Sequence, residues 1–165
     1  MSSKQNQGFT LVELITIVIL LGIVSVYASS RFLGKSSFDA RLIEQEVLSS
    51  LRLTQLRSMN RSGFCGRWLM SNNQVMQVSP MVSTGSCSTS LPTDTSDSSY
   101  VNGQEANVQL SLDADGNVNF IDFDTLGRPE QCTSDCTVTL TGQSGTQRYI
   151  CINAQGGIYA NASSC

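Results

Sequence analysis

The clearest pattern in the sequence is an apolar run over residues 9–28, in which Glu13 is the only charged residue. About 20 helical residues rise about 30 Å, which is the thickness of the hydrocarbon core of a bilayer. We therefore expect a membrane-spanning helix over residues 9–29. The eight residues before it are polar and carry one positive charge, Lys4, which favours a cytoplasmic N-terminus.

Apolar residues then recur at helical spacing over residues 30–62, which predicts an amphipathic helix. The apolar positions are Phe32, Leu33, Phe38, Leu42, Ile43, Val47, Leu48, Leu51 and Met59. Gly63 is a suitable stop for this helix. Gly34 and Ser36-Ser37 weaken the helix locally, but the pattern resumes after them. One helix from Phe9 to about Arg61, about 80 Å long, is therefore predicted.

From Arg67 onward the hydrophobic period becomes two, which indicates short strands. We expect strands at 67–71, 74–79, 108–112, 117–123, 137–141, 148–153 and 157–160. Asp115-Gly116 is a hairpin signal, so the strands on its two sides should be antiparallel neighbours. The Ser- and Thr-rich residues 84–100 predict a long exposed loop.

The predicted fold class is therefore α+β, with a long N-terminal helix packed by its second half on an antiparallel β-sheet head. The predicted divisions are 1–8 as a leader, 9–29 as the membrane helix, 30–62 as the amphipathic helix and 63–165 as the head. A chain of 165 residues has room for one such core and little more.

Charge and composition exclude several classes of function. After Trp68 the chain has nine acidic residues and only two arginines. The head is therefore acidic, and a nucleic-acid partner is not expected there. The chain contains no histidine, which removes the commonest general base and metal ligand. No nucleophile motif is present either, and Asp122 and Asp124 fit solvated acids better than a catalytic pair. An enzyme is not expected.

All six cysteines lie in the predicted head: Cys65, Cys87, Cys132, Cys136, Cys151 and Cys165. An even number outside the membrane indicates disulfides formed in an oxidising compartment. A zinc site is disfavoured, since only Cys132 and Cys136 are close in sequence. Six cysteines allow 15 pairings, and proximity along the chain favours 65–87, 132–136 and 151–165.

Glu13 distinguishes the readings of the apolar run. A secretory signal peptide cleaved after Ala28, a plain membrane anchor and a buried core helix are the alternatives, and none of them explains a carboxylate that costs about 2.5–3.5 kcal/mol to place in a membrane. Cleavage between Gly8 and Phe9 would create an α-amino group four residues before Glu13, on the same helix face. The two charges can neutralise each other, within one chain or better between neighbouring copies.

The junction Gly8-Phe9-Thr-Leu-Val-Glu13-Leu resembles the class III signal of type IV prepilins and type II secretion pseudopilins. The resemblance implies cleavage by a prepilin peptidase after Gly8, N-methylation of Phe9 and a role for Glu13 in ordering subunits during polymerisation. Many pilins have a proline near the position of Ser30, and this chain has none.

The head resembles the FimT-like minor pilins and H-type pseudopilins at Phe120-Ile-Asp-Phe-Asp-Thr-Leu-Gly-Arg-Pro129 and at Ile150-Cys-Ile-Asn-Ala-Gln-Gly. Its cysteines and apolar helix are also similar to minor pilins of the mannose-sensitive haemagglutinin (MSHA) system. Some members of this group bind DNA through basic residues after the last glycine turn. Here no Lys or Arg follows Gly157.

One further site is a calcium candidate at Asp113, Asp115 and Asn117, where oxygen ligands alternate. Val118 and Asp124 stand where an EF-hand loop would have Gly and Glu, so a polar turn is the stronger reading. No other cofactor is expected.

The resemblance implies a minor pilin-like subunit of a type IV pilus. The alternatives are a minor pseudopilin of a type II secretion system and a pilus-tip adhesin that uses loop 84–100. The implied partners are other pilin or pseudopilin subunits, the prepilin peptidase and the inner-membrane assembly platform. The implied location is the inner membrane, with a single span, a periplasmic head and an onward route into a surface pilus.

Overall fold

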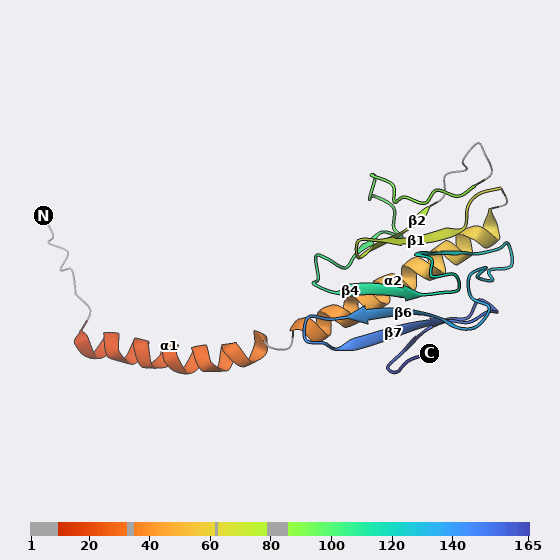
Figure 1. Cartoon of the computed structure of the whole chain (residues 1–165). Coiled ribbons are helices and arrows are strands. Elements are labelled where there is room, and N and C mark those ends of the chain that lie inside the picture. Colours follow the sequence, from red (N-terminus) through yellow and green to blue (C-terminus); the bar gives the residue numbers. More distant parts are fainter. Residues whose placement is uncertain (1–9, 33–34, 62, 79–85) are drawn as a thin grey trace, which may run out of the picture. The chain divides into compact units, whose positions relative to one another are not determined.

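A computed structural model of the chain describes residues 10–32, 35–61, 63–78 and 86–165, and the side chains of 26–38 lie outside this description. The chain divides into two compact units between Lys35 and Ser36. The first contains helix α1 (Leu11–Phe32), and the second contains nearly all of helix α2 (Lys35–Asn60) and the strands (Figure 1). Residues 33–34 lie outside the described residues, so a single continuous helix stays a prediction. None of the helices in the described ranges is both long and apolar enough to cross a membrane.

The strands of the second unit form two antiparallel sheets, which confirms the α+β class. In the first sheet the order is β3 (Val101–Asn102), β2 (Gln74–Val78), β1 (Arg67–Ser71), β5 (Phe120–Asp122). In the second sheet the order is β4 (Gln109–Asp113), β6 (Cys136–Thr141), β7 (Gln147–Ile152), β8 (Ile158–Asn161). Alternating apolar positions predicted every strand but the two-residue β3, which is too short to show a period.

Helix α2 runs alongside both sheets (Figure 1) and shares one hydrophobic core with them. Its buried apolar residues are Ala40, Ile43, Val47, Leu48 and Leu51. They share the core with Trp68 and Ile121 of the first sheet and with Val138 and Leu140 of the second. The predicted apolar positions Leu42 and Met59 are about half exposed instead, at 49% and 48%.

Small polar side chains complete the buried face of α2. Ser50 accepts a hydrogen bond from the indole Nε1 of Trp68 (3.1 Å) and donates one to the carbonyl oxygen of Ser99 (2.5 Å). The hydroxyl of Ser99 in turn accepts a bond from the backbone N–H of Gln77 (3.0 Å). Each of these buried groups therefore has a partner, and α2, both central strands of the first sheet and the 97–100 segment are joined.

The predicted hairpin at Asp115-Gly116 is wrong. Strand β4 pairs with β6, and β5 pairs with β1, so the strands on the two sides of this turn belong to different sheets. The turn is held from outside: the Asp115 N–H donates to the Gln131 carbonyl (2.9 Å), and Thr133 binds the Asp115 carboxylate (2.6 Å). These long-range bonds hold the turn at the point where the chain passes from one sheet to the other.

Two glycines with similar backbone angles provide a matched test of this packing. Gly156 (φ +87°) lies so close to the Gly127 carbonyl oxygen that a side chain would collide with it, whereas Gly145 (φ +78°) has open space at the same position. We expect Gly145→Ala to cost about 1–2 kcal/mol, because of its positive φ alone. Gly156→Ala should cost about 1–3 kcal/mol more, because of the overlap. Urea unfolding of both variants measures the difference, and equal losses would contradict the described packing of the two turns.

Candidate functional site

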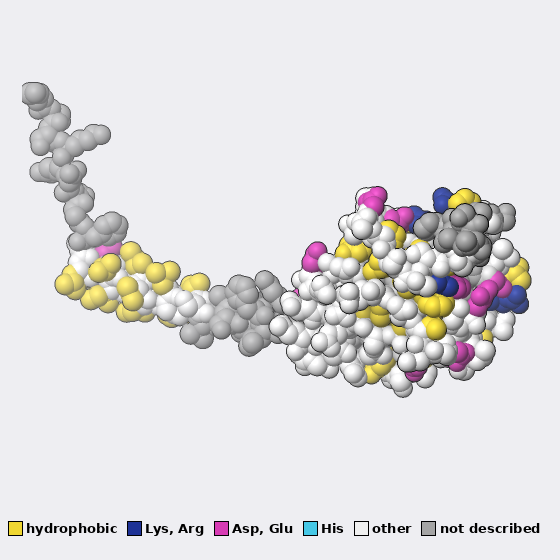
Figure 2. Space-filling view, turned by 45° about the horizontal axis from the view of Figure 1, so that its top comes forward, with side chains coloured by type: hydrophobic (Ala, Val, Ile, Leu, Met, Phe, Trp, Pro, Cys, Tyr) yellow, Lys and Arg dark blue, Asp and Glu magenta, His cyan; other side chains and the backbone are white. Residues whose placement is uncertain are grey.

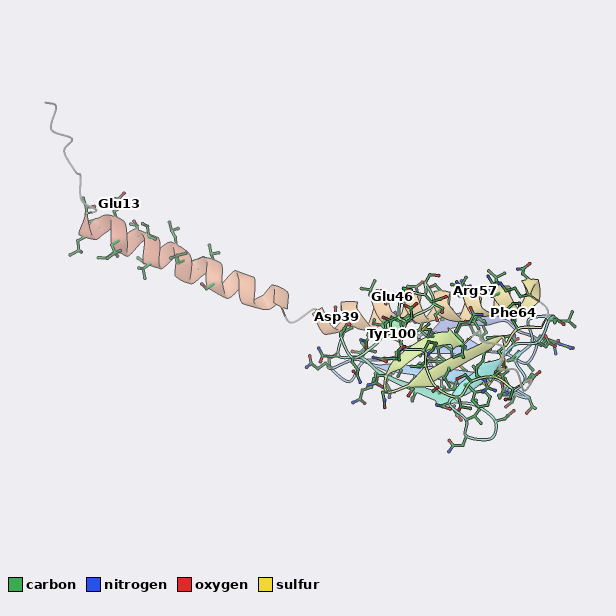
Figure 3. All side chains as sticks on the ribbon, turned by 90° about the horizontal axis from the view of Figure 1, so that it is seen from above. Glu13, Asp39, Glu46, Arg57, Phe64 and Tyr100 are labelled. Atoms are coloured by element: carbon green, nitrogen blue, oxygen red, sulfur yellow. A yellow bond between two sulfur atoms is a disulfide. The ribbon has the colours of Figure 1, made fainter. Side chains whose placement is uncertain are left out.

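The predicted cleavage junction, Gly8-Phe9, lies outside the described residues, and the description begins at Thr10 just before α1. The Thr10 hydroxyl accepts a hydrogen bond from the Glu13 N–H (3.3 Å), and the Thr10 carbonyl accepts one from the Leu14 N–H (3.2 Å). Thr10 is therefore the N-cap of α1 and Glu13 its third residue, which is the spacing of a capping box. Glu13 lies at the amino end of the helix (Figure 3), where its negative charge interacts favourably with the positive end of the helix dipole.

Hydrophobic side chains cover most of the face of α1 that Figure 2 shows for its described side chains, with an acidic side chain at the amino end. Its large hydrophobic side chains are 40–74% exposed: Leu11, Val12, Leu14, Ile15, Ile17, Val18, Ile19, Leu20, Leu21, Ile23 and Val24. Thr16 and Ser25 donate their hydroxyls to the helix's own carbonyls, at 2.8 and 2.6 Å. Their polarity is thereby satisfied internally, so these two hydroxyls add little cost when an apolar environment surrounds the helix.

Comparison with known protein families identifies a motif at the N-terminal end of the chain. Residues 3–29 match the family model of the prokaryotic N-terminal methylation motif. The chain carries the N-terminal signal of a type IV pilin-like precursor. This motif indicates processing by a prepilin peptidase, contact with other pilin subunits, anchorage at the inner membrane and a structural rather than enzymatic role. No curated protein and no solved structure shows significant similarity to the chain.

The second unit contains three disulfides: Cys65–Cys87, Cys132–Cys136 and Cys151–Cys165. These are the pairs that proximity along the chain favours. Cys151 is fully buried in β7, so its bond ties the C-terminal residues to the second sheet. The Cys65–Cys87 bond ties the segment after residue 86 to the chain between α2 and β1.

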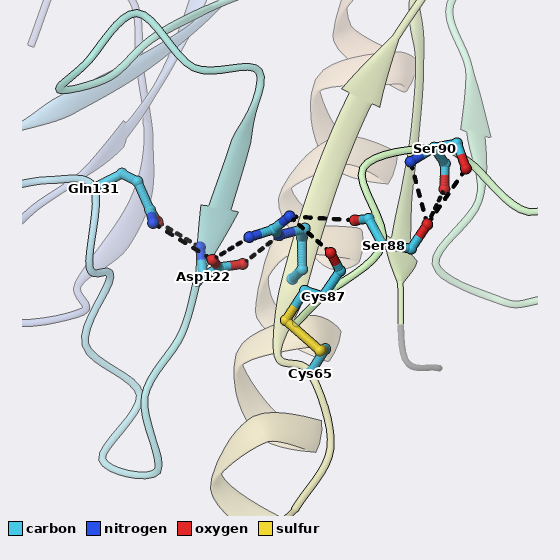
Figure 4. The surroundings of a disulfide bond; sticks show 7 residues. Cys65, Cys87, Ser88, Ser90, Asp122 and Gln131 are labelled. Atoms are coloured by element: carbon cyan, nitrogen blue, oxygen red, sulfur yellow. Dashed lines mark hydrogen bonds and ion pairs between the residues drawn. A yellow bond between two sulfur atoms is a disulfide. The ribbon is translucent and has the colours of Figure 1, made fainter. Parts of the chain in front are cut away.

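A charged cluster lies beside the Cys65–Cys87 disulfide (Figure 4). It was not predicted from the sequence. Arg67 of β1 and Asp122 of β5 form a two-bond ion pair, at 2.7 and 2.6 Å, with side chains only 10% and 17% exposed. The same guanidinium donates to the carbonyls of Cys87 (3.4 Å) and Ser88 (3.2 Å) and lies over the Phe120 ring. The interpretation of Asp122 as a solvated acid is therefore wrong. Residues 67 and 122 lie far apart in the sequence, so no local sequence pattern indicates that they pair.

Two other predicted site residues, Asp124 and Asp115, have hydrogen-bond partners of their own. Asp124 binds Arg128 in an exposed turn, where hydrogen bonds from the Arg128 and Leu126 N–H groups and the Arg128 side chain lower the pKa of the Asp124 carboxyl. Hydrogen bonds from Thr133 likewise lower the pKa of Asp115. Among the described residues, no three His, Cys, Asp or Glu side chains are grouped as metal ligands. Calcium binding at Asp113, Asp115 and Asn117 stays a prediction.

The C-terminal part of loop 84–100 is attached to α2. The prediction that this loop is exposed is therefore wrong for that part. Asp97 forms an ion pair with Arg57 (2.9 Å) and accepts hydrogen bonds from Ser99, which is fully buried. Partial burial alone would raise the pKa of Asp97, but the hydrogen bonds from Ser99 and the Arg57 guanidinium together lower it. Residues 79–85 lie outside the described residues.

The Arg67–Asp122 pair should be essential for stability. Asp122→Asn leaves a largely buried guanidinium without its counter-charge, so we expect a loss of about 2–4 kcal/mol in the free energy of unfolding. The control is Glu130→Gln, because Glu130 is exposed and its side chain makes no hydrogen bond within the described part of the chain. Chemical denaturation with all disulfides intact measures both variants. A loss no larger than that of the control would show that the pair contributes nothing.

Attachment of the loop should weaken in acid. Because the pKa of folded Asp97 lies below its ordinary value of 3.8, its contribution to stability is complete above that pH and is lost as the pH falls through the folded pKa. The stability difference between the wild type and Asp97→Asn should therefore shrink below about pH 3.8. Unfolding measured across this range tests it. A difference that stays constant across this pH range would contradict the assignment.

Proposed function

We propose that this chain is a minor pilin-like subunit that enters, or primes, a type IV pilus. Its leader is removed after Gly8, Phe9 is methylated, and residues 9–29 hold the subunit in the inner membrane before assembly. The observation that carries the proposal is the methylation motif at 3–29 joined to a helix whose apolar side chains are exposed on every side.

The exposed apolar side chains of α1 require an environment other than water. Burying one Leu, Ile or Val side chain is worth about 1.5–3 kcal/mol. Eleven such residues on α1 therefore favour an apolar environment by an amount on the order of 20 kcal/mol. A helix that is apolar all round does not suit packing on one side only. Lipid before assembly, and helices of other subunits afterwards, satisfy this requirement.

Glu13 has a role in both states. At the third position of α1, its charge is favourable next to the helix N-terminus. Removal of residues 1–8 would place a new positive charge on Phe9, one turn away. Within lipid, pairing of this amine with the Glu13 carboxylate of a neighbouring subunit offsets the cost of burying either charge. The same pair would then set the axial position of one subunit against the next.

A pseudopilin of a type II secretion system is the second candidate, since its N-terminal helix has the same requirements. The adhesin alternative does not gain from loop 84–100, whose C-terminal part is held against α2. Deleting the gene distinguishes the two assembly roles. Loss of surface fibres with normal protein secretion supports the pilus, whereas the reverse supports the pseudopilin.

Processing and assembly should be separable by substitution. Gly8→Val should block cleavage, because the peptidase must accommodate the residue before the cut, and intact-mass measurement would then find residues 1–8 retained. Glu13→Gln should be cleaved and inserted normally but be depleted at least about tenfold from sheared fibres, because its charge pair is lost.

Glu46→Gln is the control for the assembly defect, since Glu46 is an exposed residue of α2 (Figure 3). Its recovery from fibres should equal that of the wild type. An unmethylated N-terminus elsewhere than Phe9 in the wild-type protein, or full incorporation of Glu13→Gln, would overturn the proposal.

A further inference from the structure

An open cavity of about 600 Å³ lies between the turns of the two sheets in the second unit. Its walls come from the β1–β2 turn, the segment between β3 and β4, and the β6–β7 hairpin, which gather at the end of this unit where α2 begins (Figure 1). The polar side chains that line it are Asn73, Gln104, Asn107, Gln109, Thr141 and Gln143. Five of these six carry a carboxamide, and none of the lining residues is charged.

Most of these carboxamides have unused hydrogen-bonding groups. The side chains of Asn107, Gln109 and Gln143 make no hydrogen bond within the described part of the chain. Asn73 uses only its oxygen, which accepts a bond from the Leu110 N–H (3.1 Å), and Gln104 uses only its nitrogen, which donates to the Asn72 carbonyl (2.9 Å). A carboxamide offers two donors and an acceptor, so a ligand in the cavity would meet both kinds of group from several directions.

The backbone around the cavity is fixed before any ligand binds. Asn73 and Asn107 both have positive φ, 59° and 54°, the conformation that asparagine tolerates best after glycine. Gly103 donates to the Asn73 carbonyl and accepts from the Val108 N–H, both at 2.9 Å. Cross-linked turns of this kind reduce the entropy lost when a ligand binds.

We propose that this carboxamide pocket binds an uncharged saccharide. Vicinal hydroxyl groups donate and accept together, as carboxamides do, and a neutral ring needs no counter-charge. A charged ligand would find no counter-charge among the residues that line the pocket. An anionic ligand would also meet the neighbouring cavity of about 460 Å³, which shares Asn107 and is lined by Asp39, Glu46 and Glu105.

An extended peptide suits the pocket less well than a saccharide. Strand β4 is an edge of the second sheet, and a peptide would add to it through free backbone N–H groups. The Leu110 N–H at that edge is already bound by the Asn73 side chain. The site therefore offers side-chain amides rather than an open strand edge, which favours a small hydroxyl-rich ligand.

The test is an NMR titration of the full chain, disulfides intact, in a zwitterionic detergent without a sugar head group. The probes are neutral trisaccharides of glucose, galactose, mannose and N-acetylglucosamine, with trigalacturonic acid as the anionic comparison. At least one neutral probe should shift the side-chain amide signals of Asn107, Gln109 and Gln143. Its affinity should fall about tenfold in Gln109→Ala and in Gln143→Ala, each of which removes hydrogen bonds to the ligand.

The matched control is Gln155→Ala, an exposed glutamine outside the pocket, which should leave affinity unchanged. The backbone spectrum of each variant verifies that it is folded. Three results would overturn the proposal: no amide shift with any neutral probe, equal or tighter binding of trigalacturonic acid, or binding that both pocket variants retain. Shifts of the same signals by an Ala-Gly hexapeptide, without any response to the saccharides, would assign the pocket to peptides instead. None of these results depends on whether the subunit assembles.

Discussion

The packing of α2 against two separate sheets is the interaction on which the second unit depends. Both sheets contribute residues to the one core that α2 shares with them. Burial alone would leave the polar atoms of that face unpaired, so the bonds from Trp68 to Ser50 and from Ser50 to Ser99 are as necessary as the apolar contacts. They also fix which residues of α2 face which strand. The disulfides and the Arg67–Asp122 pair then secure segments at the margins of this core.

The two helices differ in how far their apolar side chains are buried. Helix α2 hides a single side within its own unit, whereas the apolar side chains of α1 remain exposed on all sides of it. Most of this exposed helix lies within the segment that matches the prokaryotic N-terminal methylation motif, residues 3–29.

Local patterns in the sequence predicted the features that depend on local physics. Alternation of apolar residues located most strands, and short separations along the chain gave the three disulfide pairs. The errors lie where distant residues decide. Asp115-Gly116 has the composition of a hairpin turn, yet bonds from Gln131 and Thr133 direct it between sheets. Likewise, the partner of Asp122 is 55 residues away at Arg67, and no periodicity or spacing connects the two.

The side-chain bonds along α2 have a mechanical consequence. Ser50, Arg52 and Gln55 hold the carbonyls of four residues from different parts of the chain: Ser99, Ile158, Gly127 and Gly156. These bonds are spread over successive turns of the helix, so tension applied along α2 is shared among them and does not concentrate on one. Tension applied to the N-terminal end of α2 would thus pass into the segments that these four carbonyls belong to.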